Sequence, residues 1–219
     1  MTLEISTKVS LTGEAHRRIE EMIVTLELVP GEVVSETILS KLIGIGTTPV
    51  REALQRLSRE HLIEILPRRG VVVTNVDVRE QLEVLETRRV LDRLIARAAA
   101  RRSTAVERTL IGELAKQIEQ TAAAGDVKGF LRLGDELNKM LAKSARNVIA
   151  AETAATLFSV SRRFWYFHLG HEGDFAETAR LYAAVANAVA AGDENAGGEA
   201  TDQLIDFLVR FTNLTLPTE

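Results

Sequence analysis

Residues 46–57 read GTTPVREALQRL, and this segment decides how the N-terminal part of the chain folds. Two threonines precede a proline, and a helix-forming run that carries Arg51 and Arg56 follows. Threonine is a good N-cap, and proline suits the first helical turn, where its missing N–H needs no partner. The segment therefore predicts a short helix capped by Thr47 or Thr48.

Two further helices are expected before this segment. In residues 14–26 apolar side chains recur at three- and four-residue steps, which is the spacing of one helical face, and Thr12 can cap this helix. Pro30 stops it, and the residues after Pro30 form a turn. Ser35 is a good cap for a second short helix that ends at Gly44.

The pattern changes to β-structure after the third helix. The runs IEIL and VVVTNV flank the sequence PRRG, in which Pro67 and Gly70 favour a turn, so a hairpin is predicted. Three helices followed by a hairpin is the order of a winged helix-turn-helix, whose third helix enters the DNA major groove.

This arrangement predicts contacts with double-stranded DNA. Hydroxyl and N–H groups at the start of the third helix suit a phosphate, Arg51 can bind a guanine edge, and arginines at the hairpin tip can reach phosphates. Each feature also has an ordinary interpretation, since Thr-Pro is a common helix start and exposed arginines are often only solvated. The predicted DNA-binding residues are Thr47, Thr48, Arg51, Arg56, Arg68, Arg69 and Gly70.

From residue 78 onward every segment is predicted to be helical. The sequence AAGD occurs at residues 123–126 and 190–193, where glycine can close one helix and aspartate can cap the next. Such helix hairpins indicate an antiparallel bundle. The fold class is therefore mainly α, with a winged helix-turn-helix in residues 1–76 and an all-helical domain in residues 77–219. The expected helices of that domain are 78–102, 105–124, 127–144, 147–168, 174–191 and 194–214.

Composition narrows the possible functions. The chain has 219 residues, a formal net charge of -4 and no cysteine, which excludes disulfides, thiolate metal sites and cysteine nucleophiles. There is no export signal and no apolar run near about 18 residues. We expect a soluble cytoplasmic protein.

The segment VPGEVVSETILSKLIGIGTTPVREALQRLSREHLIEILPRRGVVV resembles the DNA-binding domain of GntR-family bacterial regulators, with its PGE turn, TPVREAL.RL helix and P.RG wing. The helical part, with ETRRVLDRLIARAAA, AKSARN and the spaced AAGD, is similar to the FCD effector domain of the FadR-type branch. The resemblance implies a ligand-responsive transcription regulator, more often a repressor. Family members commonly have Ser-Arg where this chain has Gly46 and Thr47, so one arginine contact with DNA is missing here.

In many FCD domains, which the helical part of this chain resembles, an aspartate and three histidines bind a metal. The corresponding positions here are Gly134, Asn138, Tyr182 and Leu204, none of which is a good metal ligand. Asp135 is one residue away, and one helical step rotates a side chain by about 100°. We expect no metal and no other cofactor.

The resemblance also implies an effector pocket in the helical domain. Arg88 matches the arginine of the family's E.R..L segment, and a buried arginine is costly unless an anion meets it. The predicted effector is a small organic acid, held by Arg88 with Asn138 and Tyr182 as hydrogen-bond partners. Alternatively, Arg88 pairs only with Asp92, four residues further along the helix.

Residues 162–171, RRFWYFHLGH, concentrate aromatic side chains. His168 and His171 are a possible surface metal pair, although histidines three apart are more often structural. Arg162 or Arg163 can turn inward. Core or dimer contacts are expected of Phe164, Trp165 and Phe167.

Two other functions compete with regulation. An enzyme on a helical bundle lacks support, because the chain has no Glu-x-x-His pair, no G-x-S-x-G and no P-loop. An interaction adaptor that has kept a winged-helix scaffold is the other alternative. We predict a homodimeric regulator of operator DNA, because one recognition helix covers only a half-site and two-fold symmetry supplies the second.

Overall fold

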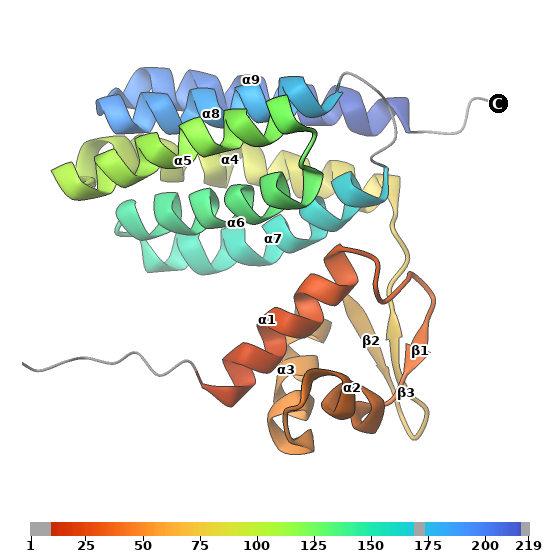
Figure 1. Cartoon of the computed structure of the whole chain (residues 1–219). Coiled ribbons are helices and arrows are strands. Elements are labelled where there is room, and N and C mark those ends of the chain that lie inside the picture. The colour runs from red at the N-terminus through yellow and green to blue at the C-terminus, as the bar shows by residue number, and fades with distance from the viewer. Residues whose placement is uncertain (1–9, 169–173, 216–219) are drawn as a thin grey trace, which may run out of the picture. The chain divides into compact units, whose positions relative to one another are not determined.

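The computed structural model describes residues 10–168 and 174–215. The chain divides into two compact units, Met1–Val76 and Asp77–Glu219, and each unit is described by itself. The described part is mainly helical, with nine helices and one small sheet (Figure 1). None of its helices is long and apolar enough to span a membrane.

The first unit is a winged helix-turn-helix. Its helices are α1 (Leu11–Val24), α2 (Glu36–Ile43) and α3 (Thr47–Arg59). The expected hairpin is formed by β2 (Ile63–Leu66) and β3 (Gly70–Val73), and a two-residue strand, β1 (Val33–Val34), pairs with the other edge of β3. Both pairings are antiparallel. The core of this unit lies between the three helices, where Ile19, Leu39 and Leu54 are almost fully buried.

Two of the predicted helix caps are wrong. Ser10, and not Thr12, caps α1 by accepting a hydrogen bond from the Gly13 N–H, so the helix begins earlier than its apolar pattern suggests. The N-cap of α3 is Gly46, which offers no side-chain hydrogen bond. Thr47 and Thr48 therefore lie inside the first turn of α3, and their hydroxyls are not used as caps. The prediction for α2 is confirmed, since Ser35 accepts from the Ile38 N–H.

Strand β1 explains why residue 70 is a glycine. The sequence predicted only a turn in this region, but Val33 pairs with Val72 and Val34 with Val71. Gly70 has φ +103, and a Cβ atom there would lie 2.6 Å from the Val34 carbonyl oxygen. Any other residue at position 70 would combine an unfavourable backbone conformation with a clash against β1.

The described part of the second unit is a bundle of six helices, which match the predicted ranges closely. They are α4 (Val78–Arg102), α5 (Ala105–Ala124), α6 (Val127–Ser144), α7 (Val148–Phe167), α8 (Asp174–Ala191) and α9 (Glu194–Leu214). Gly125 and Gly192 have left-handed backbones, with φ +66 and +77, and Asp126 and Asp193 cap the helices that follow. The two AAGD sequences thus form the helix junctions that were predicted.

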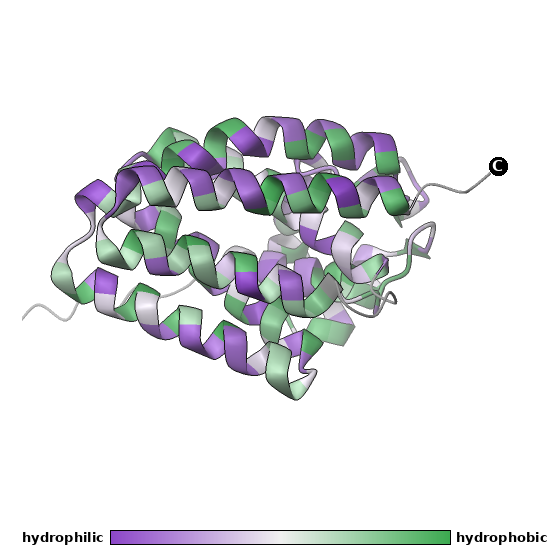
Figure 2. Ribbon diagram, turned by 90° about the horizontal axis from the view of Figure 1, so that it is seen from above, coloured by the Kyte–Doolittle hydropathy of each residue, from purple (hydrophilic) through white to green (hydrophobic). Residues whose placement is uncertain are grey.

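Helix α4 is the central element of the bundle. It packs extensively against α9 and also contacts α6, α7 and α8, while α5 packs against α8 (Figure 1). Hydrophobic and hydrophilic residues alternate along these helices, which gives each one an apolar face for the interior (Figure 2).

A ladder of charged side chains joins α4 to α9. Four arginines recur at every fourth residue of α4, so they lie on one face of the helix. Each meets a polar side chain of α9, which runs in the opposite direction. The pairs are Arg89 with Asp206, Arg93 with Asp202, Arg97 with Asn195, and Arg101 with Glu194.

Candidate functional site

Helix α3 has one buried face and one exposed face. Val50, Ala53, Leu54 and Leu57 are buried against the rest of the unit. Each helical residue is rotated by about 100°, so a residue four positions on lies about 40° away and one five positions on about 140° away. Gln55 therefore shares the exposed face of Arg51, whereas Arg56 does not. Sequence reasoning missed Gln55, although its spacing from Arg51 was a usable signal.

Arg51 is held by an acidic residue of the neighbouring helix. Its Nε lies 3.1 and 3.0 Å from the two carboxylate oxygens of Glu36, and its Nη2 lies 2.8 Å from Glu36 Oε2. The side chain of Arg51 is nevertheless 62% exposed. The hydrogen bonds with Glu36, and then its charge, raise the pKa of Arg51. Sequence reasoning did not single out Glu36, because nothing in the local pattern shows that α2 and α3 bring these two residues together.

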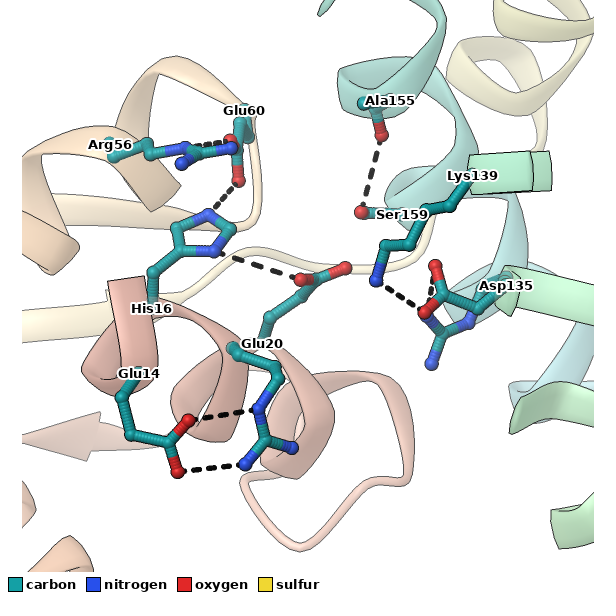
Figure 3. A network of polar contacts seen from close by, with 11 residues as sticks. Glu14, His16, Glu20, Arg56, Glu60, Asp135, Lys139, Ala155 and Ser159 are labelled. Atoms are coloured by element: carbon teal, nitrogen blue, oxygen red, sulfur yellow. Dashed lines mark hydrogen bonds and ion pairs between the residues drawn. The ribbon is translucent and has the colours of Figure 1, made fainter. Parts of the chain in front are cut away.

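Arg56 is exposed, but it contacts a polar network whose other members, His16 and Glu60, are buried (Figure 3). Its Nε donates to Glu60 Oε1 at 2.9 Å, and the other oxygen of Glu60 lies 2.6 Å from His16 Nε2 on α1. On the far side of the imidazole, Nδ1 lies 3.8 Å from Glu20 Oε2. Burial by itself raises the pKa of Glu60, but His16 and Arg56 together outweigh it and the pKa is lowered. This network ties α1 to the end of α3.

The wing presents the other predicted DNA-binding residues. Arg68 and Arg69 are exposed in the turn between β2 and β3, and Arg68 has φ +63. Within the described residues neither side chain forms an ion pair. Both guanidinium groups are therefore available at the tip of the hairpin, while Gly70 serves the close approach of β1.

The helical unit contains a cavity between α4, α6, α7, α8 and α9. Four aromatic side chains form much of its wall: Phe130, Phe158, Trp165 and Tyr182. The cavity volume available to the centre of a water molecule is about 20 Å³. This volume holds about one water. The cavity is thus narrow in this conformation, and its lining is mainly apolar.

Arg88 brings a positive charge to this cavity. Its side chain is 2% exposed, and Nε and Nη2 donate to Asp92 Oδ2 at 3.0 and 2.8 Å. The guanidinium carbon lies 5.1 Å from the centre of the Phe158 ring. Burial by itself lowers the pKa of Arg88, but the charge of Asp92 and the Tyr182 side chain outweigh it and the pKa is raised. The predicted pairing with Asp92 is present, and Arg88 also faces the cavity.

A second arginine, Arg162, lines the same cavity. Its guanidinium carbon lies 6.0 Å from the centre of the Phe158 ring, and its Nη1 lies 3.4 Å from Asp135 Oδ1. Asp135 also accepts from Lys139 at 2.5 Å (Figure 3). Arg162 is thus one of the two arginines that were expected to turn inward, and it does so. Arg163 is also buried, and burial lowers its pKa, but it does not line the cavity.

The other two predicted effector residues differ in position. Tyr182 lines the cavity and packs edge-on against Phe130 at 5.5 Å between ring centres. Asn138 is not among the lining residues, and its amide donates to the Gly134 carbonyl at 2.9 Å. Trp165 was expected only as a core or dimer contact. It is 5% exposed and lines the cavity, and its Nε1 has no hydrogen-bond partner among the described residues.

The four positions that correspond to family metal ligands do not form a metal-binding set. Gly134 and Leu204 offer no donor atom, and the Asn138 amide is engaged with the Gly134 carbonyl. Among the residues that the structure describes, no group of three or more His, Cys, Asp or Glu side chains could hold a metal.

The aromatic segment of α7 is largely structural. Phe164 and Trp165 are buried, whereas Phe167 is 47% exposed. His168 follows the end of α7 and packs against the Phe164 ring at 4.4 Å between centres. His171 lies outside the described residues, so the possible His168–His171 metal pair is outside them too.

Comparison with known proteins decides the family. Residues 11–73 match the model described as bacterial regulatory proteins, gntR family, and residues 83–207 match the FCD domain. The chain belongs to the GntR family of bacterial regulators with an FCD domain.

Individual relatives are more distant. The uncharacterized HTH-type transcriptional regulator YdhC of Bacillus subtilis (strain 168) is 26% identical over 60% of this chain and 59% of its own length. The HTH-type transcriptional repressor RspR of Escherichia coli (strain K12) is 26% identical over 72% of this chain and 69% of its own. A regulator of Streptomyces ambofaciens is 39% identical, but the match covers only 27% of its length.

Solved structures share the fold. E. coli McbR/YncC superposes with a TM-score of 0.83 at 19% identity, covering 95% of this chain and 100% of that one. A GntR regulator from Rhodococcus sp. RHA1 gives a TM-score of 0.69 at 16% identity, covering 94% and 99%. The family matches establish a transcription regulator with a DNA-binding domain, and the relatives that this chain matches are regulators and not enzymes.

Proposed function

We propose that this protein is a cytoplasmic, homodimeric repressor that releases its operator when a small carboxylate binds in the helical unit. The observation that carries the proposal is the buried Arg88 guanidinium at the wall of an apolar cavity. Trp165 lines the same cavity, and within the described residues its N–H has no hydrogen-bond partner. A cation and a hydrogen-bond donor in an apolar cavity suit an organic anion.

The cavity can accept an anion without losing Asp92. A guanidinium has five N–H donors, and Asp92 takes only the Nε and one Nη2 donor of Arg88. A carboxylate can therefore share Arg88, while Trp165 Nε1 supplies a further donor. The aromatic walls favour an effector whose remaining atoms are apolar. In this arrangement Arg162 adds positive potential, and no metal is involved.

Binding would have to widen the cavity, because it now has room for about one water. Its walls come from five helices, so widening it displaces helices relative to one another. A ligand that binds only the widened form shifts the population toward that form by its differential affinity. Through α4 such a shift can change the spacing of the two recognition helices in a dimer and lower affinity for the operator.

The DNA contact is proposed to use α3 and the wing. Arg51→Ala should weaken operator binding by about 1 to 3 kcal/mol, because a bidentate contact with a base edge is lost. Arg69→Ala should weaken binding to all sequences and lower the salt slope by about one unit, because a phosphate contact is lost. Operator can be obtained by in vitro selection from random duplex DNA. Normal operator binding by Arg51→Ala would contradict the assignment of α3.

The effector proposal is tested with the full chain and a panel of carboxylates that includes acetate, benzoate, phenylacetate, citrate and gluconate. Carboxylates with an apolar body should raise the melting temperature and release labelled operator, whereas the matching alcohols should do neither. Sedimentation should show the same dimer with and without the carboxylate. A monomeric protein, or a panel in which no carboxylate changes melting or DNA binding, would contradict the proposal.

Metal independence is tested separately. Chelator treatment should change neither the melting temperature nor operator affinity, because the positions used by metal-binding relatives lack suitable donors here. Stoichiometric zinc, nickel or manganese that is lost together with stability would contradict this part.

A further inference from the structure

We infer that Glu36 is a positioning residue that determines DNA specificity by orienting Arg51 toward a base edge. The inference rests on the proposed role of Arg51 in reading the operator. Glu36 lies on α2 and is not assigned any role in DNA binding by the family match or by the spacing of the recognition helix. Its role is inferred from its contacts with Arg51.

The geometry of the pair leaves one edge of the guanidinium open. Glu36 occupies the edge formed by Nε and Nη2, with distances of 2.8 to 3.1 Å. A guanidinium has a second edge, formed by Nη1 and the other N–H of Nη2, which points away from the first. This second edge carries two N–H groups, which can donate to the O6 and N7 acceptors of guanine. Glu36 thus binds Arg51 without blocking bidentate base recognition.

The backbone of Glu36 is itself held in place by the fold. Glu36 is the first residue of α2, directly after the capping Ser35, so its backbone is part of a defined helix start. Its side chain is 33% exposed, against 62% for Arg51. An exposed arginine loses much rotamer freedom when it binds a base, and a partner that holds it beforehand reduces that loss. The expected effect of Glu36 is therefore tighter operator binding.

The same carboxylate opposes binding to other sequences. Where no base edge accepts Arg51, the bidentate contact is lost, while the Glu36 carboxylate still repels the phosphates of the DNA backbone. Specificity is a difference between two affinities, and a group that penalises the wrong partner increases it. Glu36 should therefore strengthen operator binding and weaken binding to random DNA.

The test measures both affinities for the full-length protein. The probes are an operator selected in vitro with the wild-type chain and a random-sequence duplex of equal length. Glu36→Gln keeps the size of the side chain and removes its charge. It should weaken operator binding by about tenfold and leave random-duplex binding equal or a few-fold tighter, because one bidentate contact is loosened and one repulsive charge is removed.

A matched control separates positioning from simple charge. Glu27 is an exposed glutamate of the same unit, after the end of α1, with no ion pair among the described residues. Glu27→Gln makes the same change in net charge, and its ratio of operator to random affinity should equal that of the wild type. Melting curves of both variants establish that the unit stays folded. An equal fall of the ratio in both variants would overturn the inference.

A double-mutant cycle decides whether Glu36 acts through Arg51. If it does, Glu36→Gln should lower the operator-to-random ratio in the wild type but change it less than about twofold when Arg51 is already alanine. Independent, additive effects would overturn the inference and leave Arg51 as a reader. Normal operator binding by Arg51→Ala alone would instead overturn the proposed recognition helix, so the two failures are distinguishable.

Discussion

The two units of this protein both bury charged side chains, but they do so in different ways. In the winged helix-turn-helix, His16, Glu60 and Arg56 are joined to one another at 2.6 and 2.9 Å and connect α1 to the end of α3. In the helical unit, Arg88 meets Asp92 but also lines a cavity. Trp165 lines the same cavity, and its N–H has no partner among the described residues.

The difference indicates which buried charge is structural. A buried polar group without a hydrogen-bond partner costs free energy, so a protein retains one where the structure or a ligand requires it. The Glu60 network accounts for its own polar atoms and links two helices. Trp165, which lines the Arg88 cavity, has an N–H without a partner among the described residues, and we propose that a ligand binds in this cavity. Substitutions in the Glu60 network should therefore change the stability of the first unit, whereas substitutions at the Arg88 cavity should change the response to carboxylates.

The largest effect on stability should come from Glu60→Ala. Removing the buried Glu60 carboxylate leaves the buried His16 ring without its partner, and we expect a loss of about 3 kcal/mol in the free energy of unfolding of the first unit. Urea unfolding followed by circular dichroism measures it. Glu27→Ala, on the surface of the same unit, should change the value by less than about 0.5 kcal/mol. Equal effects of the two variants would show that the network is not structural.

Arg88→Met should have the largest effect on response. Methionine fills part of the space of the arginine but carries no charge, and Asp92, with 18% of its side chain exposed, can turn to water. We expect a loss of about 2 kcal/mol in unfolding free energy, because Asp92 and the Tyr182 side chain both lose a partner but Asp92 is partly exposed. The shift in melting temperature by carboxylates should disappear while operator binding is kept. If carboxylates still raise the melting temperature of this variant, Arg88 does not bind the effector and only pairs with Asp92.

Trp165→Phe should have a smaller and more selective effect. It removes the unpartnered N–H while keeping an aromatic side chain, so stability should stay within about 1 kcal/mol of the wild type or rise slightly. Affinity for a carboxylate that raises the melting temperature should fall about fivefold, because one hydrogen bond is lost. Isothermal titration calorimetry gives the affinity. An unchanged affinity would place the ligand away from the indole.

The smallest expected change is a pH effect in the first unit. The pKa of Glu60 is lowered in the folded protein from its ordinary value of 4.5, because His16 and Arg56 outweigh the effect of burial. A glutamate with a lowered pKa contributes stability that is present above its unfolded pKa and is lost as the pH falls through the folded value. Unfolding of the wild type between pH 6 and pH 3 should therefore depend on pH more steeply than that of Glu60→Gln. Parallel curves would exclude the contribution.

The sequence predicted the fold better than the site, and particular residues show why. Helix boundaries depend on local signals such as the capping residues Asp126 and Asp193, which act over three or four positions. The two-residue strand β1 was missed because its pairing partners, Val71 and Val72, lie far along the chain. For the same reason Arg51 was found without Glu36, and Arg88 without Trp165. Each missed partner is adjacent only in three dimensions.

The ladder between α4 and α9 has a consequence for how the bundle finds its alignment. A slide of α9 by one turn, about 5.4 Å, would bring Arg93 to Asp206 and Arg97 to Asp202, so the two middle rungs would form again. The same slide would bring Arg89 to Arg210 and Arg101 to Gly198, so charge opposes it only at the two ends of the ladder. In the middle the two alignments are distinguished by Gly198, where a Cβ atom would already lie 3.3 Å from Arg97 Cγ and 3.4 Å from Arg93 Cζ. The slide would place Asp202 at this tight contact in place of glycine, and its side chain would clash with the two arginines. The absence of a side chain at position 198 thus helps to set the alignment of the two helices.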